Sequence, residues 1–224
     1  MKEIVRGIYL LPMPLPDQFT GHVNTYLIQG DDQCILIDTG SINQQQTFIH
    51  HLAKHGISAG QIGLVVITHA HFDHVGSLKA IKALCQCPVA IHEEESPLLR
   101  KGLMVVPPGT SLFGKVASFV GKMFMRPLLR FPPVEPDILI SEDYSLESFG
   151  IPGKILPTQG HTEGSLSVLL ESGEAFVGDL AANYLPFGLG PILPPFARPR
   201  SRRRRHFRPA TRLPVAGPSR PIPQ

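Results

Sequence analysis

The spacing of hydrophobic residues in the first half of the chain predicts strands that alternate with helices. Four apolar runs bounded by turn residues have the length of buried strands: 23–28, 34–40, 64–68 and 87–92. Residues 43–56 instead show helical spacing, with Ser41 as the expected N-terminal cap and Gly56 at the end. This alternation predicts an α/β fold built in layers.

The same pattern predicts further helices and strands along the chain. A second helix is expected after the strand at 64–68, because apolar residues recur there at helical spacing: Val75, Leu78, Ile81 and Leu84. The first 16 residues contain three prolines around a short apolar run, which favours an edge strand entering the fold. Short strands dominate the second half, at 137–140, 153–158, 165–170 and 174–179.

A proline-bounded stretch, residues 101–136, interrupts this rhythm. Four basic residues fall on one helical stripe among large apolar side chains: Lys115, Lys122, Arg126 and Arg130. Insertions of this kind commonly cover a site, so we expect a lid with its charges in solvent. A basic amphipathic helix that lies on a membrane surface is the alternative.

Composition limits the class of protein. With 224 residues, of which 42% are hydrophobic, the chain can bury one sizeable core, which we assign to a single domain over residues 1–196. The chain has no apolar run of about 18 residues, so no transmembrane segment is expected. Three cysteines, an odd number, fit a reducing compartment better than a disulfide framework, and we expect a cytoplasmic protein.

The net charge of +3 comes from the end of the chain. Nine arginines lie between residues 198 and 220, and subtracting them from +3 leaves −6 for residues 1–197. An acidic body argues against a nucleic-acid partner, because such proteins need positive charge beside the site. Residues 197–224 are rich in arginine and proline and lack a periodic apolar face, so we expect a disordered tail.

A cluster of metal-ligand residues follows the predicted strand at 64–68. His69, His71, Asp73 and His74 occupy six positions in which repeated imidazoles and a carboxylate gain nothing in packing. Zinc binds histidine nitrogen and carboxylate oxygen together. Residues two apart in an extended segment point to one side, so His69 and His71 can hold one ion while the other two face a second.

One local loop cannot complete two coordination spheres, so further ligands must come from later in the chain. Two candidates lie next to glycines at predicted strand ends, namely His161 in GHTEGS and Asp179 in VGDL. His92 ends a predicted strand before EEE, and we expect it at the surface rather than among the ligands.

In these motifs the chain resembles the metallo-β-lactamase-fold hydrolases. The family signature H-x-H-x-D-H is matched by four residues in order: His69, His71, Asp73 and His74. The later G-H-T-x-G-S and G-D elements are matched by His161 and Asp179. Over residues 1–196 the resemblance implies a four-layer αββα sandwich, in which two stacked sheets carry the site at one edge.

The resemblance also implies a role for each residue. His69, His71 and His161 would bind the first of two zinc ions. Asp73 and His74 would bind the second, and Asp179 would bridge both. Asp38 in LIDTG would orient a ligand histidine through a carboxylate hydrogen bond, with an ordinary turn aspartate as the alternative.

The activity that the resemblance implies is hydrolysis of a small acyl substrate (a thioester, ester or lactone) by a metal-bound hydroxide. Asp73 would orient the hydroxide and carry its proton. Tyr184 is a candidate oxyanion donor, with simple packing as the alternative. Two other readings stay open: a mononuclear iron enzyme like the persulfide dioxygenases of this fold, and a degenerate fold that only binds.

The end of the chain departs from the family pattern. Family members carry a further strand and turn that end in a histidine for the second metal. Here the only later histidine is His206 in RRRRHFR, and burying it would bring several arginines beside two cations. We therefore expect that the last βα unit is missing and that the second metal site is incomplete. Residues 197–224 resemble the product of out-of-frame reading of a GC-rich gene, and a genuine basic tail for nucleic acid or anionic lipid is the alternative.

Overall fold

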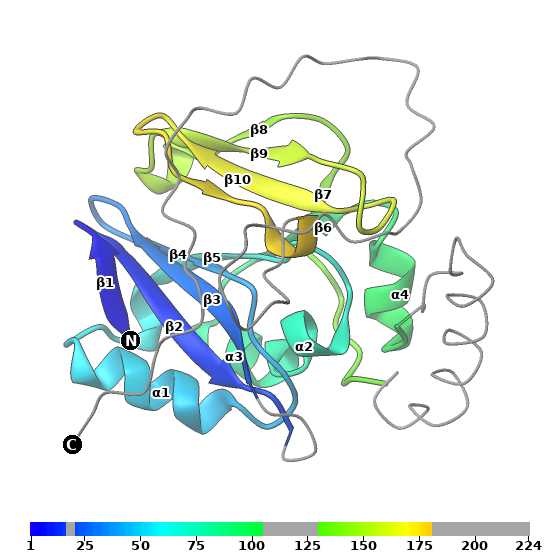
Figure 1. Cartoon of the computed structure of the whole chain (residues 1–224), viewed down its shortest axis with the longest axis horizontal. Helices are drawn as coiled ribbons and strands as arrows, with labels where there is room; N and C mark the ends of the chain where they lie inside the picture. Colours follow the sequence, from blue (N-terminus) through cyan, green and yellow to red (C-terminus); the bar gives the residue numbers. More distant parts are fainter. Residues whose placement is uncertain (17–20, 105–129, 181–224) are drawn as a thin grey trace.

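The computed structural model describes residues 1–16, 21–104 and 130–180, which form two stacked β-sheets with helices against the larger one (Figure 1). The larger sheet has seven strands in chain order: β1 (Lys2–Val5), β2 (Ile8–Pro14), β3 (His22–Gln29), β4 (Cys34–Ile37), β5 (Ile62–Val66), β6 (Val89–His92) and β7 (Ile138–Ile140). Strands β1 to β4 pair antiparallel, and β4 to β7 pair parallel.

The smaller sheet is antiparallel and comes from the second half of the chain. Its four strands run in the order β11 (Ala175–Phe176), β10 (Leu166–Leu170), β9 (Gly153–Pro157) and β8 (Tyr144–Ser145). The described helices are α1 (Gln45–Lys54), α2 (Phe72–Val75), α3 (Leu78–Cys85) and α4 (Ser96–Lys101), with short 3-10 turns η1 (Ala59–Gln61), η2 (Glu147–Phe149) and η3 (Gly178–Leu180).

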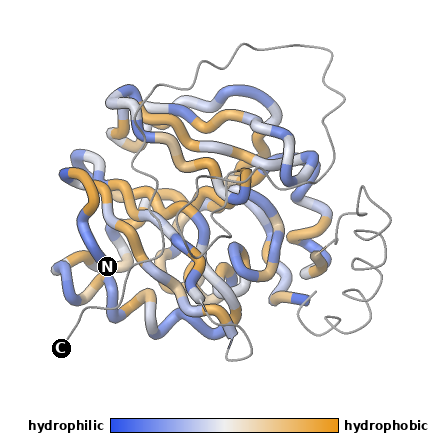
Figure 2. The backbone as a smooth tube through the Cα atoms, in the orientation of Figure 1, coloured by the Kyte–Doolittle hydropathy of each residue, from blue (hydrophilic) through white to orange (hydrophobic). Residues whose placement is uncertain are grey.

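Alternation along the strands of the larger sheet creates two cores. In β4, Leu36 packs with Phe48 of α1 on the helix side, whereas Ile35 and Ile37 face the smaller sheet. Both faces are therefore covered, which explains why β4 and β6 are buried at every position. Figure 2 shows hydrophobic residues along the strands of both sheets and hydrophilic residues along the outer loops. The predicted α/β arrangement in layers is confirmed.

The prediction of an edge strand in the first 16 residues is confirmed in part, because an edge strand and a second, inner strand form there. β1 is the edge strand, and β2 pairs with both β1 and β3. The prolines of β2 do not interrupt its pairing with β1. Pro12 and Pro14 lie beyond the part of β2 that pairs with β1, where no ladder hydrogen bond is needed on that side.

Two predictions about helices also need correction. Ser41 does not cap α1; its hydroxyl donates to the carbonyl oxygen of Pro14, and the helix begins after Gln44. The segment after residue 74 is not one helix, since Gly76 and Ser77 separate α2 from α3. Leu84 is 41% exposed, whereas Cys85 of the same helix is buried.

The predicted lid is described only at its two ends. A β-bridge joins Leu103 to Arg130, and Phe131 and Val134 are buried against the helix-side core. The intervening residues 105–129 lie outside the described part of the chain. No helix in the described part is long and apolar enough to cross a membrane.

Candidate metal centre

The histidine cluster begins where β5 ends. After Val66 the chain continues through an irregular segment to His71, whose extended backbone precedes the first turn of α2. Asp73 and His74 lie in that turn. The exposed fractions of His69 and His74 are only 1% and 3%, so the cluster is withdrawn from solvent.

The smaller sheet brings the two distant residues to this loop. His161 lies between β9 and β10, and Asp179 lies in η3 directly after β11. The backbone N–H of Leu166 donates to the carbonyl oxygen of Thr68 at 2.8 Å. A Cβ on Gly178 would lie 2.8 Å from the Thr68 hydroxyl oxygen, so only glycine lets Asp179 approach this closely.

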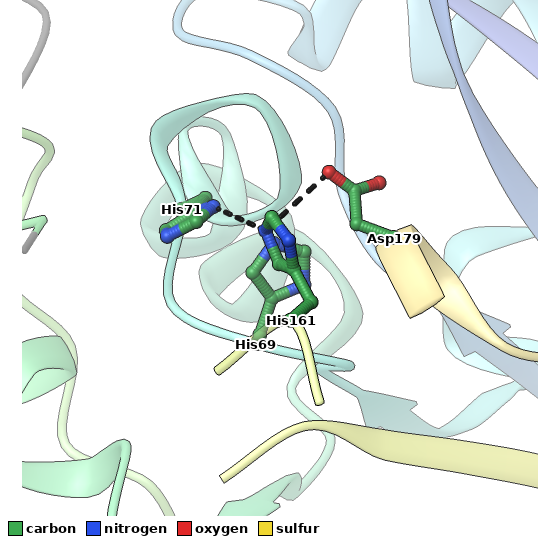
Figure 3. Close-up of side chains that lie close together, drawn as sticks. All are labelled: His69, His71, His161 and Asp179. Carbon is green, nitrogen blue, oxygen red and sulfur yellow. Dashed lines mark hydrogen bonds and ion pairs between the residues drawn. The ribbon is translucent and has the colours of Figure 1, made fainter. Parts of the chain in front are cut away.

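Four residues form the first ligand group: His69, His71, His161 and Asp179. Their ligand atoms all lie within 4.8 Å of one another (Figure 3). The His161 Nε2 atom lies 3.0 Å from Nδ1 of His71 and 3.6 Å from Oδ2 of Asp179. Three segments far apart in the sequence thus point their side chains at one small volume.

Three residues form the second group: Asp73, His74 and Asp179. The His74 Nε2 atom lies 3.3 Å from Oδ1 of Asp179 and 3.8 Å from Oδ2 of Asp73. Asp179 belongs to both groups and turns one carboxylate oxygen toward each, as expected of a bridging ligand.

Asp38, directly after β4, connects the two ligand groups through hydrogen bonds. It is 2% exposed and adopts a positive φ of 61°. Its carboxylate accepts hydrogen bonds from the backbone N–H and the hydroxyl of Thr68 and from Nδ1 of His74, each at 2.8 Å. Because the Thr68 hydroxyl proton goes to Asp38, its oxygen accepts from Nδ1 of His69 at 3.1 Å.

These contacts determine whether the imidazoles of His69 and His74 are protonated. Burial, reinforced by the neighbouring imidazoles, lowers the pKa of His69 well below its usual value, so its ring is neutral. Burial opposes protonation of His74 as well, but the carboxylates of Asp38 and Asp179 outweigh it and raise the pKa of that imidazole. Burial would raise the pKa of Asp179, but His74 holds it well below its usual value.

The donor set fits a divalent metal ion. The Nε2 atom of His69 is buried and has no hydrogen-bond partner among the described residues. Its Nδ1 carries the proton, so Nε2 presents a lone pair to the cluster. Ligand nitrogens about 2.0–2.1 Å from a tetrahedral zinc lie about 3.3 Å apart, close to the 3.0 Å between His71 and His161.

The structure therefore brings together seven of the eight site residues that the sequence predicts: His69, His71, Asp73, His74, His161, Asp179 and Asp38. Tyr184 lies outside the described residues, as do His206 and the tail at 197–224. The expectation that His92 lies at the surface is wrong. It is 4% exposed, because Gly164 of the His161 loop packs against its ring.

Sequence reasoning missed Thr68 and Glu95. Both are buried and contact the histidine loop, through the hydrogen bonds between Thr68 and His69 and between Glu95 and Ala70. Glu95 is the last of three consecutive glutamates, and the other two, Glu93 and Glu94, are exposed. No spacing in the sequence distinguishes the buried glutamate from the exposed ones.

Two stacked sheets with a histidine and aspartate centre at one edge define the class of protein. The family model of the metallo-beta-lactamase superfamily matches residues 19–209. The chain belongs to this superfamily, and the predicted sandwich fold is thereby confirmed. A metallo-beta-lactamase family protein from Thermus thermophilus superimposes with a TM-score of 0.64 at 25% identity, over 82% of this chain and 62% of that one.

Curated relatives carry related descriptions. A probable metallo-hydrolase of Methanocaldococcus jannaschii is 33% identical over 149 residues, which are 66% of this chain and 63% of the relative. A probable metallo-hydrolase of Bacillus subtilis is 28% identical over 162 residues, 70% of this chain and 65% of the relative. The chain thus matches slightly less than two thirds of the length of these relatives.

Proposed function

We propose that this chain is a metal-dependent hydrolase that cleaves a small acyl substrate such as a thioester, an ester or a lactone. The observation that carries the proposal is the convergence of two ligand groups on the shared Asp179, with the His69 lone pair directed into the cluster. Membership of the superfamily and the descriptions of the curated relatives support it.

The proposed ligands follow from the two groups. His69, His71 and His161 would hold the first ion, Asp73 and His74 the second, and Asp179 both. Zinc suits this mixture of nitrogen and oxygen donors, and iron is the alternative. Such ions, when bound, act as Lewis acids toward a carbonyl oxygen and lower the pKa of coordinated water.

Asp73 is the proposed catalytic residue of the chain itself. Its side chain and that of Asp179 are 23% and 24% exposed, whereas that of His74 is 4% exposed, so the carboxylates form the open side of the cluster. In the metal-free chain, burial raises the pKa of Asp73 above its usual value. Asp73 would orient the attacking water and accept its proton.

Two finer points belong to the same proposal. Tyr184 would donate a hydrogen bond to the oxyanion.

A cytoplasmic location is supported by the cysteines, since Cys34, Cys85 and Cys87 are all free and buried. A reducing compartment keeps such thiols unpaired.

The test is a panel of thioesters, esters and lactones offered to the purified, metal-loaded protein. We expect hydrolysis, strongest for apolar members. Asp73→Asn should lower kcat by about 10²–10⁴-fold, the usual contribution of a positioned acid or base, while the first ion is retained. Asp32→Asn, an exposed aspartate outside the site, is the matched control and should leave kcat unchanged.

Other outcomes would contradict the proposal. Oxygen consumption with a persulfide substrate, together with no hydrolysis of any panel member, would establish the iron dioxygenase alternative. Metal uptake with neither reaction would favour a fold that only binds.

A further inference from the structure

Glu95 is a buried acidic residue outside the ligand set. It follows β6 and directly precedes α4, and it is 3% exposed, whereas Glu93 and Glu94 before it are exposed. A buried carboxylate is costly unless it accepts hydrogen bonds, so its partner indicates what it does.

That partner is the backbone between two proposed metal ligands. The Oε2 atom of Glu95 accepts a hydrogen bond from the N–H of Ala70 at 2.9 Å. The methyl group of Ala70 is fully buried in the helix-side core. The peptide that joins His69 to His71 is therefore held by a carboxylate and by packing at the same residue.

Glu95 also packs against the loop that carries the third histidine. A Cβ on Gly164 would lie 2.6 Å from Cγ of Glu95 and 3.2 Å from its backbone nitrogen. Only glycine fits at this contact, and Gly164 lies three residues after His161. Glu95 thus contacts both loops that supply the three histidines of the first ligand group.

Asp38 does not duplicate this contact. Asp38 holds Thr68 and His74, at the beginning of the loop and in α2. Glu95 holds Ala70, the residue between His69 and His71. The two carboxylates therefore fix different parts of the same loop.

We propose that Glu95 is a positioning residue for the first metal site. By accepting the Ala70 N–H it holds His69 and His71 at the separation that one ion requires, and it sets the affinity for that ion through this geometry. The inference rests on the proposed metal binding, and it concerns a residue that contacts neither ion nor substrate.

Two substitutions of Glu95 distinguish the effect of side-chain length from the effect of charge. Glu95→Asp keeps the negative charge but withdraws the carboxylate by one methylene, so the hydrogen bond to Ala70 is lost. Glu95→Gln keeps the length and an acceptor oxygen but removes the charge. The dissociation constant for zinc is measured by competition with a chromophoric chelator, and the coordination geometry is followed through the visible absorption of bound cobalt.

We expect Glu95→Asp to weaken zinc binding by about 10–100-fold, the usual effect of losing a group that orients ligands, and to shift the cobalt bands. Glu95→Gln should keep the affinity and the bands of the unsubstituted protein. Equal affinities in Glu95→Asp and the unsubstituted protein, or equal losses in both variants, would overturn the inference. Absence of zinc binding by the unsubstituted protein would instead refute the proposed function.

A control separates positioning from general loosening of the fold. Thr25 is 1% exposed, and its hydroxyl donates to the carbonyl oxygen of Leu11 within the larger sheet. Thr25→Val should lower the Tm of the metal-free protein but leave the zinc affinity unchanged. If Thr25→Val and Glu95→Asp weakened zinc binding equally, the role assigned to Glu95 would be wrong.

Discussion

The hydrogen bonds of Asp38 connect the two ligand groups. One carboxylate contacts His74 directly and His69 through the Thr68 hydroxyl. Both histidines are thereby held with the proton on Nδ1, and Nε2 is directed at the cluster. The alternative reading of Asp38 as an ordinary turn aspartate does not account for three hydrogen bonds at a buried carboxylate.

Asp38→Asn is the sharpest substitution at this position. Asparagine tolerates the positive φ of 61°, so the backbone need not change. Its amide nitrogen, however, places a donor opposite at least one existing donor in either orientation of the side chain. We expect metal affinity to fall by about 10–100-fold. The free energy of unfolding of the metal-free protein should fall by about 1–3 kcal/mol.

Isothermal titration with zinc and urea denaturation measure the two effects. Asp32→Asn makes the same chemical change at an exposed position and should alter neither quantity. Unchanged zinc affinity in Asp38→Asn would show that the histidines do not need this carboxylate.

The metal-ligand residues could be predicted from the sequence, but the residues that hold them in place could not. Imidazole and carboxylate at fixed spacing reveal a metal site because no packing role explains them. Glu95 and Thr68 act through hydrogen bonds with Ala70 and Asp38, residues that are distant from them in the sequence. His92 failed as a prediction for the same reason, since its burial depends on Gly164, more than 70 residues away.

At the scale of elements, α2, which carries Asp73 and His74, ends where Gly76 contacts the segment that follows β4. A Cβ on Gly76 would lie 2.5 Å from the carbonyl oxygen of Phe72 and 2.5 Å from the carbonyl carbon of Ser41. Close approach of two backbones at this point places the ligand turn against the end of β4. Apolar spacing alone predicted one continuous helix, because it does not register a backbone contact of this kind.

Gly76→Ala should therefore destabilise the protein. The added methyl group meets backbone atoms that have no rotamer to change, so we expect the free energy of unfolding to fall by about 1–3 kcal/mol or more. Thermal and urea unfolding measure the effect. Gly60→Ala is the matched control, since nothing lies within 4 Å of the methyl group that it would add and stability should hardly change.

Strands with both faces buried were predicted well, as were β9, β10 and β11 of the smaller sheet, whereas its fourth strand, β8, was not predicted. β4, β5 and β6 are apolar runs because both faces are covered, a pattern visible in the sequence alone. β8 has two residues and exists only because β9 pairs with it. Pairing of this kind depends on tertiary contacts, which local spacing does not encode.

For the whole molecule, the contact between the two sheets assembles the site. Leu166 of β10 is fully buried between the sheets, and its backbone N–H donates to Thr68 beside the histidine loop. Leu166→Ala should lower the free energy of unfolding by about 2–5 kcal/mol through the cavity that it leaves.

The same substitution should weaken metal binding, because the smaller sheet carries His161 and Asp179. Leu139→Ala removes the same atoms at a position that is 49% exposed, and both stability and metal binding should stay close to those of the unsubstituted protein. Equal loss of stability in the two leucine variants would show that the sheets do not share the core described above.

The metal content of the purified protein tests the central claim most directly. Elemental analysis is carried out after dialysis against a weak chelator, on the unsubstituted chain, on His71→Ala and on His50→Ala, a control at an exposed histidine of α1. The first ligand group has four members and the second three, with Asp179 in common. We therefore expect one tightly held zinc or iron ion per unsubstituted chain, the same content in His50→Ala, and a sharp loss in His71→Ala. Metal content that is unchanged in His71→Ala would contradict this expectation.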